Sequence, residues 1–422
     1  MPTAPCWRPP TRFLFRFALI YLLLYNLPFP LSYIPGLERV ADWYQRAWNP
    51  VVVWTGAHVL HLSYPITVLP EGSGDTTWNY VQVMCNFAIA LAGAIAWSLL
   101  DRRSVAYPRL FDWLRAYVRF SLGATMISYG VIKVIQLQFA APGTDRMIQP
   151  LGEMSPMGLL WTFMGMSYGY NLFTGLGEML GGLLLFFRRT ALLGAVVSIG
   201  VLGHVFVLNM CYDVPVKLFS AHLLLMAMFV ALPDGRRLAN VLLLNRPTDA
   251  APLRPLFQRA WLHRGAIVLR NLLIIAFVGY SLYDANRQLK ASDVRSPLAG
   301  VWEVQQFELD GQPRPPLVTD ELRWQRVVIT YPWSAAFQMM NGARRAYRTT
   351  LDPERRTIEL GKWSEPNWKP VLTYDRPDDE TLVLTGDLDG HHIRAVARRA
   401  PPPTFLLTSR GFHWVSEYPF NR

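Results

Sequence analysis

The chain has 422 residues, of which 51% are hydrophobic and only 17% are charged, and its formal net charge is +11. Soluble globular proteins carry about 25% charged residues, so this composition argues against one large soluble enzyme. The abundance of apolar residues also excludes intrinsic disorder. The three cysteines, Cys6, Cys85 and Cys211, lie beside or within apolar runs and are too few for a disulfide framework.

The positive charge belongs to the apolar part of the chain. Residues 1–296 contain 25 Lys and Arg against 14 Asp and Glu, whereas residues 297–422 contain 16 of each kind. The basic residues are not interleaved with aromatic residues on a soluble domain, so nucleic acid is not an expected partner. We therefore predict two domains, a helical transmembrane domain over 1–290 and a separate domain over 297–422.

Seven apolar runs in the first part approach the length of about 20 residues that a helix needs to cross a bilayer. These runs are 13–34, 79–100, 115–139, 167–187, 190–211, 216–233 and 265–283. The sequence therefore predicts a polytopic α-helical membrane bundle of about seven spans. Pro28 and Pro30 predict a break near the end of the first helix.

The distribution of basic residues predicts the orientation of these spans. If the N-terminus is cytoplasmic, the inside segments contain 17 basic residues and the outside segments contain seven. Cytoplasmic loops are enriched in Lys and Arg, so this split favours that orientation. It places the protein in the inner (cytoplasmic) membrane of a bacterium, with the C-terminal domain on the periplasmic side. A count of six or eight spans would reverse this, and the weakest span is 216–233.

The connection 35–78 is long and aromatic, which is typical of a segment that lies at the bilayer interface. His58 and His61 would share one face of a helix, but no nearby Cys or carboxylate completes a metal site, so no metal is predicted. Directly before the second span, Asp75 or Thr76 is expected to cap the helix. The alternative is that the neighbouring glycines bring the backbone close to a ligand.

Four ionisable residues stand inside the predicted spans: Lys133, Glu178, His204 and His222. Such side chains are costly in a bilayer and usually face the bundle interior. The predicted topology places all four between the bilayer midplane and the outer surface. Two interpretations remain open. Glu178 pairs with Lys133 or a histidine and stabilises the bundle, or the layer forms a polar pocket for a small amphipathic molecule or a proton relay.

Polar neighbours extend this layer and are expected to bind the molecule in such a pocket. These ligand-binding candidates are Tyr129, Gln136, Tyr170, Thr174 and His222. Tyr170, Thr174 and Glu178 follow one another at spacings of four, which gives one helix a polar stripe. Gly177 and Gly181 form a GxxxG motif that predicts close helix packing. The stretch 141–166 contains turn residues and an apolar piece too short to span, so it is a candidate re-entrant roof over the pocket.

The C-terminal domain has a different pattern, with short alternating runs. These are 301–307, 326–330, 346–350, 381–384 and 393–396. Asp310-Gly311 and Asp389-Gly390 are residue pairs typical of hairpin turns. About eight antiparallel strands closed into a β-barrel or sandwich are therefore expected. The aromatic stretch 410–414 is interpreted as a plug at one end of the barrel, or as a ligand rim or a contact with the bundle.

Residues 129–233 resemble the DoxX superfamily of membrane proteins, with a core at about 115–233. The matching features are Tyr129-Gly130-Val131-Ile132-Lys133, then Gly177-Glu178-Met179-Leu180-Gly181-Gly182, Arg188-Arg189 and a further apolar helix with His204. DoxX-like proteins have been linked to quinone-coupled membrane redox complexes. The resemblance implies a quinone whose head group is surrounded by Lys133, Glu178 and His204 as catalytic residues, and a redox protein as partner.

The C-terminal domain is similar to lipocalin-like barrels. Gly300-Val301-Trp302 matches the GxW near the first strand of those barrels. The resemblance implies that Arg410 is the late arginine that packs over this tryptophan.

Three functions follow as hypotheses. The first is a subunit of a quinone-linked membrane oxidoreductase. The second is a non-enzymatic module that binds or transfers a lipid-like molecule with its barrel, which a barrel filled by its own side chains would argue against. The third is an assembly or anchor subunit in which the polar residues of the bundle are structural.

Overall fold

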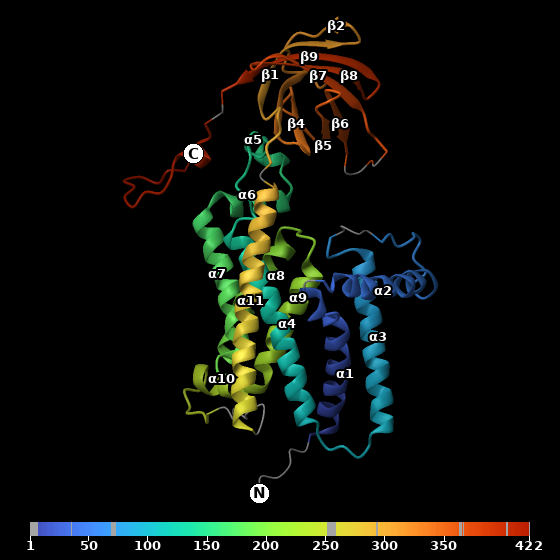
Figure 1. Cartoon of the computed structure of the whole chain (residues 1–422), viewed down its shortest axis with the longest axis vertical. Helices are drawn as coiled ribbons and strands as arrows, with labels where there is room; N and C mark the ends of the chain where they lie inside the picture. The colour runs from blue at the N-terminus through green and yellow to red at the C-terminus, as the bar shows by residue number, and fades with distance from the viewer. Residues whose placement is uncertain are drawn as a thin grey trace. The chain divides into compact units, whose positions relative to one another are not determined.

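The computed structural model describes residues 7–34, 36–68, 73–250, 259–292, 294–362, 365, 367–401 and 404–421. The chain divides into two compact units (Figure 1). The first unit contains residues 1–134 and 172–282 and is helical. The second contains 135–171 and 283–422, so the segment expected to roof the bundle belongs instead to the compact unit of the C-terminal domain.

The helices of the first unit follow the apolar runs of the sequence. They are α1 (Pro9–Asn26), α2 (Glu38–His58), α3 (Thr77–Leu100), α4 (Pro108–Val134), α7 (Tyr168–Phe186), α8 (Ala191–Cys211), α9 (Lys217–Ala231), α10 (Gly235–Leu242) and α11 (Ala260–Ser292), with single 3-10 turns at Leu31–Tyr33 and Leu232–Asp234. The first residues of α7 and the last residues of α11 fall in the second unit.

Five helical stretches among the described residues are long and apolar enough to cross a membrane, which indicates a membrane protein. They are Pro9–Tyr33, Thr77–Leu100, Ala191–Cys211, Lys217–Leu242 and Ala260–Ser292. The other two predicted spans, 115–139 and 167–187, overlap α4 and α7, which are not among the five. Polar side chains within these two helices lower their mean hydropathy. The predicted count of about seven spans is therefore not confirmed.

The region between α1 and α3 is amphipathic, as expected. α1 ends at Asn26, before Pro28 and Pro30. In α2, Trp48 is buried while Trp43 is 70% exposed.

The two histidines of this region are not placed as expected. α2 ends at His58, and His61 lies beyond it with a φ of +48°, so these two histidines do not share a helix face.

The turn before α3 fixes two helices at once. Thr76 is the N-cap of α3 and forms a capping box with Asn79. The carboxylate of Asp75 instead accepts hydrogen bonds from the backbone N–H groups of Lys217 (2.8 Å) and Leu218 (2.9 Å) at the start of α9. A carboxylate stabilises the positive end of a helix dipole. Asp75 is therefore a cap, but for a helix about 140 residues away in the sequence.

The C-terminal domain is a closed antiparallel β-barrel of eight strands (Figure 1). Its strands are β1 (Gly300–Leu309), β3 (Trp324–Tyr331), β4 (Ser334–Met339), β5 (Arg344–Asp352), β6 (Thr357–Gly361), β7 (Val371–Asp378), β8 (Thr381–Leu388) and β9 (His391–Ala400), and the short β2 (Gln312–Pro313) pairs with β1. Pairing of β1 with β9 closes the sheet. All five predicted runs lie in strands, which confirms the alternation as a β signal.

Both predicted hairpin turns are confirmed. Asp310 and Gly311 have φ values of +53° and +76°, and Asp389 and Gly390 have φ values of +51° and +84°. Two successive positive φ values are typical of a type I′ turn, whose twist matches the flanking strands. Leu309 pairs with Gln312 across the first turn, and Leu388 with His391 across the second.

The barrel interior is filled by its own side chains. Trp302, Phe307 and Trp324 are almost completely buried in one continuous apolar core. The Arg323 guanidinium is also buried and donates to the carbonyls of Arg314 (2.9 Å) and Trp324 (3.1 Å). Among the described residues these side chains occupy the centre of the barrel, which argues against a barrel that carries a lipid.

Two expectations about the C-terminal tail are wrong. The guanidinium groups near the Trp302 ring belong to Arg376 (5.8 Å) and Arg399 (5.7 Å), which reach it from β7 and β9. Arg410 instead lies 3.9 Å from the ring centroid of Phe420. The tail residue Trp414 is 91% exposed, so 410–414 does not plug the barrel.

The segment between α4 and α7 packs on the barrel within the second unit. It contains α5 (Thr144–Met147), a 3-10 turn at Leu151–Glu153 and α6 (Pro156–Met166). α5 contacts β3, and Ile148 packs against Val301 and Val328. Arg344 Nη2 lies 2.7 Å from Asp145 Oδ2, and both groups are partly buried. These contacts explain why this segment is part of the barrel unit.

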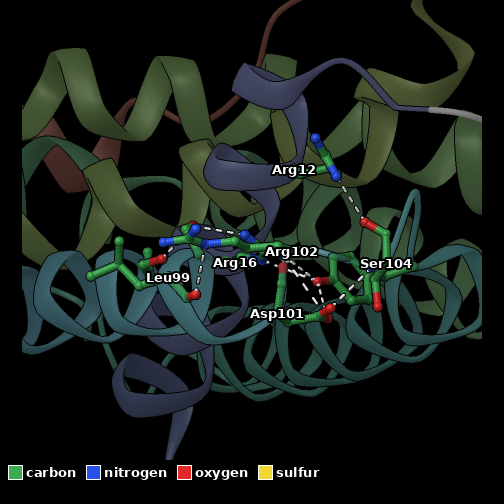
Figure 2. A network of polar contacts seen from close by, with 9 residues as sticks. Arg12, Arg16, Leu99, Asp101, Arg102 and Ser104 are labelled. Carbon is green, nitrogen blue, oxygen red and sulfur yellow. Dashed lines mark hydrogen bonds and ion pairs between the residues drawn. The ribbon is translucent and has the colours of Figure 1, made fainter.

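The ends of α1 and α3 are joined by a buried arginine network (Figure 2). Arg16 is 4% exposed, and it donates to Ser98 Oγ (2.7 Å), to the carbonyl of Asp101 (2.8 Å) and to the hydroxyl of Tyr107. Tyr107 in turn donates to Asp101 Oδ2 (2.7 Å). Arg12 donates to the Ser104 carbonyl nearby.

The hydrogen bonds of this network also keep the carboxyl group of Asp101 ionised. Hydrogen bonds from Ser104 and Tyr107 hold the pKa of the Asp101 carboxyl well below its ordinary value. The guanidinium of Arg16 also lies 5.7 Å from the Trp97 ring centroid and 5.3 Å from that of Tyr107. Arg16 therefore joins α1 to the end of α3 and the segment that follows it.

Replacing Arg16 tests this connection. Arg16→Met removes the charge at similar length and leaves the oxygens of Ser98 and Asp101 without their donor. Breaking a buried charge network by removing one partner costs about 3 kcal/mol. We expect that loss in the free energy of unfolding, measured by SDS titration of the purified protein. The exposed neighbour Arg102, changed to Met, is the matched control and should change stability by less than about 0.5 kcal/mol.

Candidate functional site

The candidate site is a buried ion pair in the helical unit. Lys133, in the last turn of α4, donates from Nζ to Oε1 of Glu178 on α7. Both side chains are buried, with 6% and 4% exposure. Two charges are stable in such a place only when they compensate one another. The expectation that Glu178 pairs with Lys133 is confirmed.

Glycines bring α4 and α7 close enough for this pair to form. A Cβ on Gly130 of α4 would lie 2.6 Å from the carbonyl oxygen of Gly175, and one on Gly182 would lie 2.8 Å from that of Gly123. No side chain fits at such a distance. On α7 the closest approach to α4 is thus made by Gly175 and Gly182. Of the predicted pair, Gly181 is also closely packed, because a Cβ there would lie 3.0 Å from Ser198 Oγ.

Only one of the two carboxylate oxygens of Glu178 takes part in the ion pair. Among the described residues, its buried Oε2 has no hydrogen-bond partner. A carboxylate accepts several hydrogen bonds, and a buried polar atom without one costs about 1–3 kcal/mol. The site can therefore accept a hydrogen bond from a hydroxyl or N–H group, next to an ammonium that can donate one.

His222 lies in a separate polar cluster. Its Nδ1 is 2.7 Å from the Leu218 carbonyl, which can only accept, so Nδ1 carries a proton. In the neutral ring Nε2 then accepts from the Tyr21 hydroxyl at 2.6 Å. Tyr25 stacks on the imidazole with ring centroids 4.0 Å apart. Both ring nitrogens are thus engaged within the protein, and His222 does not contact the Lys133–Glu178 pair.

The expectation that His204 faces the bundle interior is wrong. His204 is exposed on α8, whose inward residues include Ala195, Ser198 and Leu202. Successive residues of a helix are separated by about 100°. His204 is therefore about 200° from Leu202 and points to the opposite side. It does not join Lys133 and Glu178.

The remaining candidates lie in both compact units, with Tyr129 and Thr174 in the first and Gln136 and Tyr170 in the second. Tyr129 is 37% exposed, and its ring lies 5.9 Å from that of Phe219 on α9. Thr174 is half-buried on α7. Gln136 follows the end of α4 with a φ of +55°, and Tyr170 packs edge-on against Phe163 at 5.5 Å. Of the eight predicted site residues, contact between candidates is seen for Lys133 and Glu178.

Sequence reasoning missed Tyr21 and Tyr25, the partners of His222. These tyrosines are four residues apart within the apolar first span, a spacing that puts both on one helix face. That spacing is the signal that could have identified them. The contact of Asn26 Oδ1 with the Ser121 hydroxyl (2.6 Å) has no such signal, since the two residues are 95 positions apart.

Among the described residues, no group of three or more His, Cys, Asp or Glu side chains could hold a metal ion. Comparison with known proteins shows a relative in a Bacillus species. The chain is 32% identical to the "Uncharacterized protein YwoB" of Bacillus subtilis (strain 168) over 145 residues, which is 30% of this chain and 86% of the Bacillus protein. The chain belongs to the YwoB family.

This family membership identifies a relative and leaves the activity open, because YwoB is described only as uncharacterized. No family model matches the chain. No solved structure matches it either.

A double-mutant cycle measures how much the ion pair stabilises the bundle. Lys133→Met and Glu178→Leu each leave one buried charge without its partner, so each should lower the free energy of unfolding by about 3 kcal/mol. Lys133→Met combined with Glu178→Leu should cost clearly less than the sum of the single changes, because no charge is left unpaired. The exposed barrel pair Arg356–Asp375 is the control and should contribute at most about 1 kcal/mol. Additive effects at Lys133 and Glu178 would contradict this account.

Proposed function

We propose that the helical unit binds the polar head group of a small amphipathic molecule beside Glu178. The observation that carries this proposal is the buried Glu178 Oε2, which has no partner among the described residues although it lies next to a charged lysine. Trp78 Nε1 and Asn86 Oδ1 also lack a partner among the described residues, but Glu178 Oε2 is the one that lies beside a buried ammonium group. Most buried polar atoms of native proteins are hydrogen-bonded, so such an acceptor calls for a functional explanation. The two interpretations made from the sequence then apply together, since the pair both stabilises the bundle and offers a free acceptor.

A quinone is the ligand that these groups fit best, in line with the resemblance to DoxX proteins. A bound quinone supplies reversible two-electron, two-proton chemistry. The Lys133 ammonium can donate a hydrogen bond to a quinone carbonyl, and Glu178 Oε2 can accept one from a quinol hydroxyl. A carboxylate held at this position can also take up or release the proton. The electrons would come from a redox protein partner, so the chain would act as one subunit of a quinone-linked oxidoreductase.

The same proposal includes a location. Five spans, like seven, are an odd number, so either count puts the barrel on the opposite side from the N-terminus. The 17-to-7 split of basic residues supports a cytoplasmic N-terminus. The barrel would then be periplasmic, in a protein of the bacterial inner membrane.

The quinone proposal is tested by the amount of quinone that co-purifies with the protein. Glu178→Gln replaces a charged acceptor, and hydrogen bonds to charged groups contribute about 1.5–3 kcal/mol. Retained quinone per protein should therefore fall about tenfold or more, measured by extraction and chromatography after purification from native membranes. His204→Gln changes an exposed histidine of the same unit and should retain the wild-type amount. Wild-type retention in both Glu178→Gln and Lys133→Met would contradict the proposal.

A second candidate is an assembly or anchor subunit that presents the barrel to another protein. It is favoured by the filled barrel interior, which leaves the outer surface as the part available for binding. In that case one stoichiometric partner should co-purify equally with wild type and with Glu178→Gln, as measured by quantitative mass spectrometry. Loss of the partner in Glu178→Gln together with loss of quinone would favour the first candidate.

A further inference from the structure

An apolar cavity lies within the second unit, away from the barrel interior. α5 and α6 line one part of it, and Phe405 with the first residues of α12 (Leu406–Ser409) line another. Its volume is about 450 Å³. Binding sites for small molecules occupy about 300–1,000 Å³, so the cavity has the size of a ligand site.

The cavity is lined mostly by apolar side chains, and several of these remain exposed. Nine of its eleven lining residues are apolar. Phe163 and Leu407 are 58% and 60% exposed, and Leu159 is 38% exposed. Leaving such surface in water costs about 25 cal/mol per Å². An apolar occupant would therefore bind here by removing this surface from water.

The polar members of the lining point to an anionic group on that occupant. Thr162 donates its hydroxyl to the Gly158 carbonyl at 2.8 Å, so that proton is already used. Arg146 donates from Nη1 to Gln149 Oε1 at 2.7 Å. No carboxylate within the described ranges forms an ion pair with Arg146. Among the described residues, Arg146 therefore places a positive charge without a carboxylate partner at the edge of an apolar cavity.

The chain beyond α12 continues this exposed apolar surface. Phe412, Trp414 and Tyr418 are 76%, 91% and 84% exposed in the segment 404–421. Trp and Tyr are enriched at membrane–water interfaces, where the ring is apolar and its polar atom stays wet. A segment with three such side chains in a membrane protein is suited to contact with lipid.

We propose that this cavity binds an acyl chain of an anionic phospholipid, with Arg146 contacting the phosphate. The apolar lining takes the hydrocarbon, and the uncompensated guanidinium takes the charge. The site uses neither Lys133 nor Glu178 and is independent of quinone binding.

The test is native mass spectrometry of the full chain released from nanodiscs. The discs contain equal amounts of phosphatidylglycerol and phosphatidylcholine with the same acyl chains. One basic residue near a membrane surface contributes about a fivefold preference for anionic lipid, so wild type should retain phosphatidylglycerol about fivefold over phosphatidylcholine. Arg146→Gln should lower this ratio towards one while lipid still binds. Leu159→Trp fills the cavity and should lower retention of both lipids.

Matched controls separate the site from general effects on folding or charge. Arg355→Gln removes an exposed barrel arginine, and Leu317→Trp adds an indole at an exposed position outside the cavity, so both should behave as wild type. If Leu159→Trp fails to fold, the ratio of retained phosphatidylglycerol to phosphatidylcholine in Arg146→Gln still tests the proposal. An unchanged ratio in Arg146→Gln, equal retention of the two lipids by wild type, or a bound peptide or second copy in place of lipid would overturn the proposal.

Discussion

A charge that is removed from water must be compensated by another group of the protein, and the helical unit is arranged around that requirement. Arg16 is surrounded by oxygens of α3 and of the chain that follows it. Lys133 faces Glu178. Arg115 of α4 lies 2.6 Å from Asp234, which follows α9. Each of these contacts joins segments that are distant in the sequence, so the compensation of charge also determines which helices are neighbours.

The same requirement draws attention to one atom, Glu178 Oε2, on which the proposed function rests. Most buried polar groups of the bundle have a partner inside the protein, including both nitrogens of His222. Glu178 Oε2 does not, although the other oxygen of the same carboxylate is paired. A protein that only needed to join α4 to α7 could have done so with apolar side chains at lower cost. The ion pair with a free acceptor is therefore consistent with the proposed binding site.

Local patterns predicted the elements of this protein well, because each pattern is caused by a nearby property of the chain. Asp-Gly pairs form hairpin turns since both residues tolerate positive φ, and alternating runs form strands since successive side chains point to opposite faces. The candidate site was predicted in part. Lys133 and Glu178 were recognised because a charge in an apolar helix needs a partner. His204 was wrongly included, because depth in the membrane gives no information on which side of the helix a residue faces.

The sequence by itself determined that this is an apolar, basic chain with long helices followed by a barrel domain of zero net charge, and that charges inside the helices must be paired. Only the tertiary structure decided the partners. It assigned Asp75 to the start of α9, His222 to Tyr21, and the segment 135–171 to the barrel unit. The physical reason is range: hydropathy and turn chemistry act over a few residues, whereas a hydrogen bond or an ion pair acts between whichever groups the folded chain brings within about 3 Å.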